Sequence, residues 1–269
     1  MGTTKLVILA RGLGTRMRAV SPDDALGREQ RNAADAGLKA MIPIDRPFLD
    51  YALSAFADAG LRDVCLVIGP EHEAIRAYYS SVAAHRLRIT FAIQDNPIGT
   101  ADAVLAARDF ASDDDFLVAN SDNYYPASVI ETLRRSPAPA LPAFSRAGLL
   151  RDGQIPAERI AKYALLDIGA DGVLRRIVEK PSEQQLRELA DARVSMNCWL
   201  FDAGIFEACE RVPPSSRGEL ELPLAVQFGI EHLGMRFHTF PTDAAVLDLS
   251  HRADIPTVTG RLRGTRVEL

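Results

Sequence analysis

The sequence lacks the features that mark membrane, disulfide-rich and zinc-binding proteins. It has three cysteines, Cys65, Cys198 and Cys209, which are far apart and form no Cys-x-x-Cys pair. This spacing favours neither a disulfide framework nor a zinc site, and it fits core thiols in a reducing compartment. No apolar run approaches the length of a membrane span, and the N-terminus has no apolar signal region. We therefore expect a cytoplasmic protein that has no membrane partner.

An excess of positive charge is also missing, because the formal net charge is −5. This balance argues against nucleic acid as a partner, although it is compatible with a local basic site for phosphate. Apolar residues make up 47% of the 269 residues and charged residues 25%, which is ordinary for a globular protein. A chain of this length fits one large α/β domain or two small ones, and it can bury roughly three quarters of its unfolded surface.

The most informative stretch is an apolar run that is followed at once by two glycines. Residues 5–10 predict a strand buried on both faces, as in a parallel sheet. Gly12 and Gly14 allow a sharp turn, whose backbone N–H groups can bind an anion, and Arg16 adds a guanidinium that suits phosphate oxygens. We interpret this turn as a phosphate-binding loop; a plain tight turn is the alternative. Position 17 is not glycine and no Gly-Lys-Ser/Thr segment follows, so neither the dinucleotide fingerprint nor the Walker pattern fits.

Further along the chain, short apolar strands alternate with helical patterns. The expected elements are a helix over 49–57 with Gly60 at its C-terminal end, a strand over 64–68, a helix over 74–79, and strands over 87–93 and 116–120. This alternation predicts a doubly wound α/β sheet with parallel strands. Ligands of such sheets bind beyond the carboxyl ends of the strands.

Polar residues stand at two of these strand ends. Gln94 follows the third strand, and its amide could read the edge of a base. After it, Gly99 would permit close approach of the base and Thr100 could cap the next helix. A surface amide and an ordinary helix start are the alternative. Asp122 follows the strand over 116–120, where a carboxylate suits Mg²⁺; an Asx-turn is the alternative there.

The second half of the chain predicts an antiparallel hairpin over 161–178 that ends in Glu179-Lys180-Pro181. An exposed ion pair is the ordinary explanation of such a Glu-Lys pair. Asn197 lies in an expected strand over 194–201, where it is either a site residue or a buried structural amide. Segment 136–142 is expected to be a loop or a short buried connector. Later elements are a helix that opens at 217–222, a strand over 235–240 and a helix from 251.

Several motifs resemble those of one enzyme family. The run LARGLGTR at 9–16 resembles the L-A-A-G-x-G-T-R signature of the sugar-1-phosphate nucleotidyltransferases, also called NDP-sugar pyrophosphorylases. The resemblance continues at Lys39, at EKP (179–181) and at RGELE (217–221), so it covers most of the chain. It implies a Rossmann-like, GT-A-like fold with a mixed, mostly parallel sheet and helices on both faces. The implied single domain covers 1–269, with a nucleotide half to about 135, a sugar half over about 136–250 and a closing helix over 251–269.

The resemblance also implies a set of site residues. The implied catalytic residues are Arg16, Lys39, Asp122 and Lys180, and the implied Mg²⁺ ligands are Asp122 and Asp248. The implied substrate-binding residues are Gly12, Leu13, Gly14, Thr15, Gln94, Gly99, Thr100, Asn120, Tyr163, Glu179 and Asn197. In the family pattern, Gln94 would read the base, Glu179 would bind sugar hydroxyls and Lys180 would bind the sugar phosphate.

The sequence departs from the family pattern at several positions. Arg11 stands in place of alanine, Ala40 in place of proline and Ser121 in place of glycine. Ala164 replaces a glycine that usually contacts the sugar, so its methyl group could crowd the sugar pocket. The link over 17–37 is longer than usual, and it is either a flap over bound triphosphate or a surface insertion without a role.

The implied reaction transfers a nucleoside monophosphate from a nucleoside triphosphate to a sugar 1-phosphate, with Mg²⁺ as the cofactor and pyrophosphate as the second product. A catalytically silent protein of the same fold, which binds a nucleotide or an NDP-sugar, is the alternative. Arg11, Ala40 and the long link give it some weight, whereas the retained site residues speak against it: Arg16, Lys39, Asp122, Lys180 and Asp248. A dinucleotide-binding oxidoreductase is disfavoured by the missing third glycine. The sequence leaves open which base and which sugar are used, and whether the chain forms a homo-oligomer.

Overall fold

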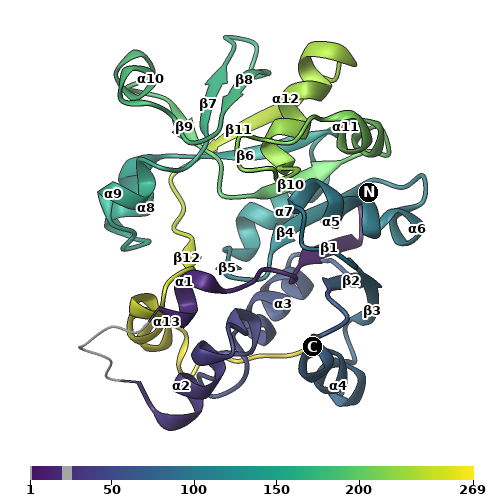
Figure 1. Cartoon of the computed structure of the whole chain (residues 1–269), viewed down its shortest axis with the longest axis vertical. Helices are drawn as coiled ribbons and strands as arrows, with labels where there is room; N and C mark the ends of the chain where they lie inside the picture. Colours follow the sequence, from purple (N-terminus) through teal and green to yellow (C-terminus); the bar gives the residue numbers. More distant parts are fainter. Residues whose placement is uncertain (1, 20–25) are drawn as a thin grey trace.

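The structure, a computed structural model, describes residues 2–19 and 26–269 and is organised around a ten-stranded sheet (Figure 1). The strands of this sheet are β1 (Lys5–Leu9), β2 (Asp63–Ile68), β3 (Arg88–Ile93), β4 (Phe116–Asn120), β6 (Ala140–Phe144), β7 (Leu165–Ile168), β8 (Leu174–Val178), β9 (Arg193–Val194), β10 (Cys198–Phe201) and β11 (His238–Thr242). Their order is β3-β2-β1-β4-β10-β6-β9-β7-β8, and β11 pairs with β6. Outside the sheet, β5 (Asn123–Tyr124) pairs with β12 (Leu247–Asp248).

The first four strands form the parallel part of the sheet. Strand β1 pairs in parallel with β2 and β4, and β2 pairs in parallel with β3. Strands β1, β2 and β4 are apolar and almost entirely buried, whereas the edge strand β3 is half-exposed. Because the carboxyl ends of parallel strands meet at one edge, the segments that follow β1, β3 and β4 lie together there. Ser121 donates its main-chain N–H to Leu9, and Gln94 donates its own to Ile68.

The remaining strands make the sheet mixed. Strand β10 runs antiparallel to both β4 and β6, and β9, β7 and β8 continue the sheet in antiparallel fashion. In this antiparallel part of the described sheet, β11 is the exception, because it pairs in parallel with β6. Most registered residue pairs of the sheet are nevertheless in parallel ladders, so the predicted mixed, mostly parallel sheet is confirmed.

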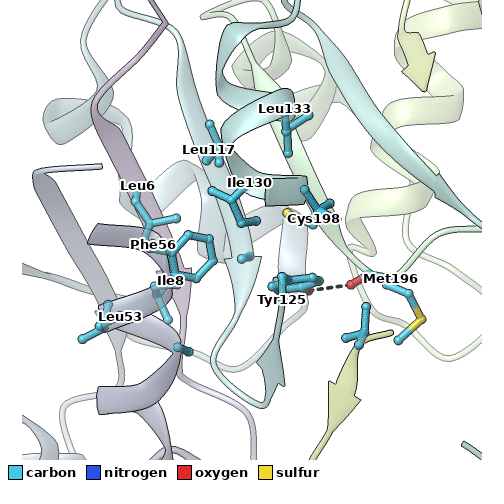
Figure 2. Packing of buried hydrophobic residues seen from close by; sticks show 14 of the residues in the cluster. Leu6, Ile8, Leu53, Phe56, Leu117, Tyr125, Ile130, Leu133, Met196 and Cys198 are labelled. Carbon is cyan, nitrogen blue, oxygen red and sulfur yellow. Dashed lines mark hydrogen bonds between the residues drawn. The ribbon is translucent and has the colours of Figure 1, made fainter. Parts of the chain in front are cut away.

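Helices cover both faces of the sheet, as the alternation of elements predicts. One face packs against α3 (Phe48–Asp58), α4 (Glu73–Ser81) and α7 (Ala127–Arg135), and the other against α5 (Thr100–Ala106), α11 (Ile205–Arg211) and α12 (Leu222–His232). Strand β1 contributes side chains to the apolar cores on both faces of the sheet. Leu6 and Ile8 belong to the core beneath α3, α4 and α7, and Val7 and Leu9 belong to the core beneath α5, α11 and α12. Figure 2 shows Leu6 and Ile8 beside Phe56 of α3.

The stretch after the glycine loop is joined to the body by a third apolar cluster. This stretch of chain contains the helices α1 (Thr15–Arg18) and α2 (Arg28–Asp35), and the short helix η1 (Lys39–Met41) follows it. Met17 and Ala34 are completely buried in this cluster, which also contains buried residues of α13 (Ile255–Leu262), and Gln30 donates to the Thr259 hydroxyl at 3.2 Å. The described part of 17–37 is therefore packed rather than a free insertion. Residues 20–25, which belong to the stretch expected to be either a flap or a surface insertion, lie outside the described residues.

Several sequence predictions need correction. The strand expected over 194–201 is divided into β9 and β10 by a turn at Asn197, and the hairpin expected over 161–178 begins only at Leu165. Segment 136–142 is not wholly a loop or connector, because β6 begins at Ala140 and is completely apolar and buried; its prolines concealed a strand. The late strand, predicted over 235–240, begins three residues later at His238. The helix expected from 251 is present as a short turn η2 (Arg252–Asp254) and α13.

Four short helices complete the described chain: α6 (Arg108–Ala111), α8 (Arg146–Arg151), α9 (Ala157–Ile160) and α10 (Glu183–Glu188). No helix among the described residues has the length and apolar character that crossing a membrane requires.

Candidate active site

One cavity of about 850 Å³ opens at the carboxyl ends of β1 and β4, where the parallel and antiparallel parts of the sheet meet. The sixteen residues that the sequence predicts for the site all line this cavity. They come from segments as far apart as the glycine loop, the end of the β7–β8 hairpin and β12. The fold therefore brings the predicted residues together, while the role of each stays a prediction.

The glycine loop has one packed side and one open side. Gly14 has φ 64°, and a Cβ there would overlap the main chain of Gly37. At Gly12 a Cβ would meet no atom within 4 Å. The loop is thus held against the segment before η1, and Gly12 leaves its cavity side free for a ligand. Arg16 follows on α1 and lines the same cavity.

Lys39 and Asp122 form an ion pair on the cavity wall. The Nζ–Oδ2 distance is 2.8 Å, and both side chains are mostly buried. Burial alone would raise the pKa of the Asp122 carboxyl, but the Lys39 ammonium beside it outweighs burial and holds that pKa below its ordinary value. Asp122 is therefore ionised at neutral pH and has a cation within hydrogen-bond reach.

Asp248 is placed beside Asp122 by the small β5–β12 ladder. In this ladder Asp248 pairs with Asn123, and the Asp122 carbonyl accepts a hydrogen bond from the Leu249 N–H at 2.8 Å. The two aspartates, which are 126 positions apart in the printed numbering, thus lie on adjacent backbone segments at one end of the cavity.

The Asp248 carboxylate is held by three donors. Arg159 and the Tyr163 hydroxyl each donate to its Oδ2 at 2.6 Å, and Ser250 donates to Oδ1. Arg159 also pairs with Asp254 at 2.5 Å, so its guanidinium bridges two carboxylates. Burial, and then the Asp248 charge, raise the pKa of Tyr163, which keeps this hydroxyl protonated and a donor. The sequence reasoning missed Arg159, since no local pattern links it to Asp248.

The two aspartates fit the donor set of a magnesium ion. Mg²⁺ prefers oxygen ligands and usually takes one or two carboxylates together with substrate phosphates. Within residues 2–19 and 26–269 no group of three acidic, histidine or cysteine side chains gathers as a metal site. A magnesium ion held by Asp122 and Asp248 would complete its coordination with other oxygen ligands, such as water and substrate phosphate.

A second group of charges lies across the cavity at the β7–β8 hairpin and the start of α12. Arg217 donates to Glu221 at 2.8 Å, and Lys180 lies 3.5 Å from the same carboxylate oxygen. Burial, and then the charge of Glu221, raise the pKa of Glu179. Glu221 is the N-cap residue of α12, so the prediction that a helix opens at 217–222 is confirmed.

The predicted base-reading segment makes mostly internal contacts. Gln94 donates its amide hydrogens to the Gly99 carbonyl at 2.9 Å and to the Asp102 carboxylate at 2.8 Å. Gly99 has φ 137°, and a Cβ there would overlap the Leu220 carbonyl, so the close approach that the structure shows is to the chain itself. The prediction that Thr100 caps the helix that it begins is wrong. Its hydroxyl accepts from the Leu222 N–H at 2.8 Å and caps α12 instead.

The other predicted substrate-binding residues lie on strand ends and turns of the same cavity. Asn120 ends β4, and Asn197 precedes β10 with φ 55°. The Asn197 carbonyl accepts from the Tyr125 hydroxyl at 3.3 Å, which ties this turn to the core. Ala164 is buried, and its carbonyl accepts from the Ser195 N–H.

Comparisons with known proteins show which family the chain resembles. Residues 5–240 match the model of a family described as nucleotidyl transferase. A glucose-1-phosphate thymidylyltransferase of Streptomyces griseus is 30% identical over 228 residues, which are 84% of this chain and 57% of that protein. A UTP–glucose-1-phosphate uridylyltransferase of Haloferax volcanii is 26% identical over 96% of both chains. The chain spans little more than half the length of the first of these relatives.

Solved structures share the fold. A UDP-glucose pyrophosphorylase complexed with UDP-glucose superposes with a TM-score of 0.76 at 16% identity, over 98% of this chain and 99% of that chain. A UTP-bound UGPase from Acinetobacter baumannii gives 0.71 at the same identity, over 98% and 95%. At this level of identity the likeness establishes the fold alone.

Proposed function

The chain belongs to the nucleotidyl transferase family, and we propose that it transfers a nucleoside monophosphate from a nucleoside triphosphate to a sugar 1-phosphate. The observation that carries the proposal is one cavity whose lining combines a glycine loop, two adjacent carboxylates and the cations Arg16, Lys39 and Lys180. The names of the relatives, which act on glucose 1-phosphate, support the same class of substrate.

In the proposed reaction, an oxygen of the sugar phosphate attacks the α-phosphorus of the triphosphate in line. The new P–O bond forms as the bond to the β-phosphate oxygen breaks, and pyrophosphate leaves. A phosphate monoester is already an anion at neutral pH, so no general base is needed. Such transfers depend on positioning and on neutralisation of charge more than on covalent chemistry.

We assign roles by position on the cavity wall. The loop amides around Gly12 and the Arg16 guanidinium would bind the leaving pyrophosphate, because they lie together at the end of β1. Lys39, next to Asp122, would stabilise charge between the reactants, and Lys180 on the opposite wall would orient the sugar phosphate. Asp122 and Asp248 would hold Mg²⁺, which when bound neutralises phosphate charge.

The remaining predicted residues divide between the two substrates. Gln94, Gly99 and Thr100, on the side of the parallel strands, would face the nucleotide. Tyr163, Glu179 and Asn197, on the side of the antiparallel strands, would face the sugar, and Asn120 lies between them. We accordingly place the boundary between the nucleotide and sugar halves near residue 135. A cytoplasmic location is supported by the three cysteines, which are buried free thiols.

The test is release of pyrophosphate, with Mg²⁺, across a panel of nucleoside triphosphates crossed with a panel of sugar 1-phosphates. We expect release that requires both substrates. In the same assay Asp122→Asn should lower kcat by about 10²–10³-fold while far-UV circular dichroism stays unchanged, because it removes one preorganised charge and keeps the side-chain shape.

Two results would contradict the proposal. If Asp122→Asn turned over at the wild-type rate, the assignment of Asp122 as a Mg²⁺ ligand would be wrong. Stabilisation of the fold by a triphosphate, without release for any pair of substrates, would instead favour the silent nucleotide-binding protein.

A further inference from the structure

Arg11 occupies a buried position immediately before the glycine loop, where the family pattern has alanine. Only 7% of its surface is exposed. Its Nε donates to the Gln94 carbonyl at 2.5 Å and its Nη2 to the Asp95 carbonyl at 3.0 Å, while Nη1 pairs with Glu71. The side chain therefore binds the main chain of the 94–99 segment and does not offer its charge to the phosphate loop.

These contacts connect three separate segments at the carboxyl edge of the sheet. Arg11 follows β1, Glu71 lies between β2 and α4, and Gln94 follows β3. A Cβ at Gly69 would lie 2.6 Å from the Arg11 Cζ, so the turn after β2 packs directly on the guanidinium. A planar guanidinium with fixed donor directions holds its partners in one geometry, which alanine cannot do.

The side chain of Gln94 is fixed from its other end. Both acceptors of its amide hydrogens, the Gly99 carbonyl and the Asp102 carboxylate, can only accept, so the amide nitrogen must face them. Among the described residues no donor meets Oε1 of Gln94, and this atom is not one of the buried polar atoms that lack a partner. Oε1 is thus the acceptor that Gln94 leaves for the cavity that it lines.

We propose that Arg11, neutralised by Glu71, is a positioning residue that fixes residues 94 and 95 so that Gln94 presents a preorganised acceptor to an N–H group of the nucleotide base. The proposal rests on the proposed function, because it takes a nucleoside triphosphate as the ligand of this wall. Arg11 acts through Gln94 and makes no contact with phosphate. Preorganisation of this kind raises affinity because the segment loses less conformational freedom on binding.

Arg11→Ala tests the proposal and introduces the residue that the family pattern has. The ligand is the triphosphate that gives the most pyrophosphate in the panel or, without turnover, the one that most stabilises the fold. We expect Arg11→Ala to raise its Kd, by titration calorimetry, about 10-fold, the order of one lost charge-assisted network. The ratio between the Kd of the next best triphosphate and the Kd of the preferred one should decrease. The KM for the sugar 1-phosphate should change by less than about two-fold.

Two further variants keep the experiment decisive. Glu71→Gln keeps Arg11 in place and should shift the Kd in the same direction by a smaller factor, which tests the clamp even if Arg11→Ala folds poorly. Arg88→Ala, on the neighbouring strand β3, removes an exposed arginine that pairs with Asp63 away from the cavity, and it should change neither constant.

The outcomes separate this proposal from the proposed function. If the wild type turns over and Arg11→Ala lowers only the unfolding temperature, with unchanged Kd and base preference, Arg11 is structural and the inference is wrong. If the wild type binds a triphosphate without turnover, the proposed function fails, and the comparison of Kd values still decides the role of Arg11. A wild type that binds no triphosphate overturns both.

Discussion

The cavity has two walls, and they hold their polar groups differently. On the wall made by the parallel strands, Arg11 and Gln94 are almost completely buried, and their side chains contact main-chain carbonyls and the carboxylates of Glu71 and Asp102. On the wall made by the antiparallel strands, the side chains of Lys180 and Arg217 are 45% and 47% exposed. Both of them share one acceptor, the carboxylate of Glu221.

The difference follows from the architecture. Parallel strands end at one edge, so the segments that follow them pack on one another: the turn at Gly69 after β2 packs on the Arg11 guanidinium, and a Cβ at Gly69 would overlap it. The β7–β8 hairpin belongs to the antiparallel part of the sheet (Figure 1), and the Lys180 side chain just after it is 45% exposed. We infer that the first wall is preformed for its ligand, whereas the charges of the second exchange protein partners for the ligand when it binds.

The largest effect should come from the contact between the segment after β3 and the segment before α12. Gly99→Ala would place a Cβ onto the Leu220 carbonyl at a φ of 137°, which side chains rarely adopt. We expect a loss of about 2–4 kcal/mol in the free energy of unfolding, measured with urea, from backbone strain and overlap together. Gly12→Ala is the matched control, because its Cβ meets no atom within 4 Å, and it should change stability by less than about 0.5 kcal/mol. Equal stability of the two variants would show that this contact is not rigid.

A change in the open wall should affect binding without affecting stability. Arg217→Ala removes a half-exposed guanidinium, and pairs of this kind contribute about 0–1 kcal/mol to folding. We expect the KM for the sugar 1-phosphate to rise about 10–100-fold, the range of a lost charge-assisted hydrogen bond, with the KM for the triphosphate unchanged. Arg211→Ala, which breaks the i,i+4 pair with Glu207 outside the cavity, is the control. A rise in the KM for the triphosphate instead would assign Arg217 to the nucleotide wall.

The parts of this arrangement that the sequence predicts are those that depend on local pattern. Continuous apolar runs predict β1, β2 and β4 to within about a residue, because strands buried on both faces carry no polar positions. The rule that ligands bind beyond the carboxyl ends of such strands then places Gln94 and Asp122 at one edge, and the structure brings them to one cavity.

The rest depends on contacts between distant segments. No local sequence pattern around Arg159 predicts its hydrogen bond to Asp248. Likewise, the Thr100 hydroxyl caps a helix that begins more than a hundred residues later. Arg11 is visible in the sequence only as a departure from a motif, since its partners lie on two other turns. The sequence does not predict strand β6 because proline is rare in strands. Burial of the whole segment overrides that preference here.

The smallest effect should come from the acid pair of the open wall, and its sign depends on pH. Burial, and then Glu221, raise the pKa of Glu179 above its ordinary 4.5, so the folded state binds this proton more tightly than the unfolded state. The contribution of Glu179 to stability is therefore full below that ordinary value and is lost as the pH rises through the folded pKa. Glu179→Gln should be more stable than wild type at pH 7, by about 1 kcal/mol or less, and equal to it near pH 4.

Glu221 provides the control with the opposite sign. Burial alone would raise its pKa, but the hydrogen bonds from Arg217 and Ser215 and the charges of Lys180 and Arg217 together outweigh burial, and the pKa lies below 4.5. Its contribution is present at neutral pH and is lost as the pH falls through the folded pKa, so Glu221→Gln should lose stability at pH 7 and approach wild type in acid. Urea unfolding of both variants from pH 3 to pH 8 checks the pair. Parallel curves for the two variants would mean that the open wall is too well solvated to distinguish its acids, and that the charges of this wall adjust to the ligand more freely than the structure indicates.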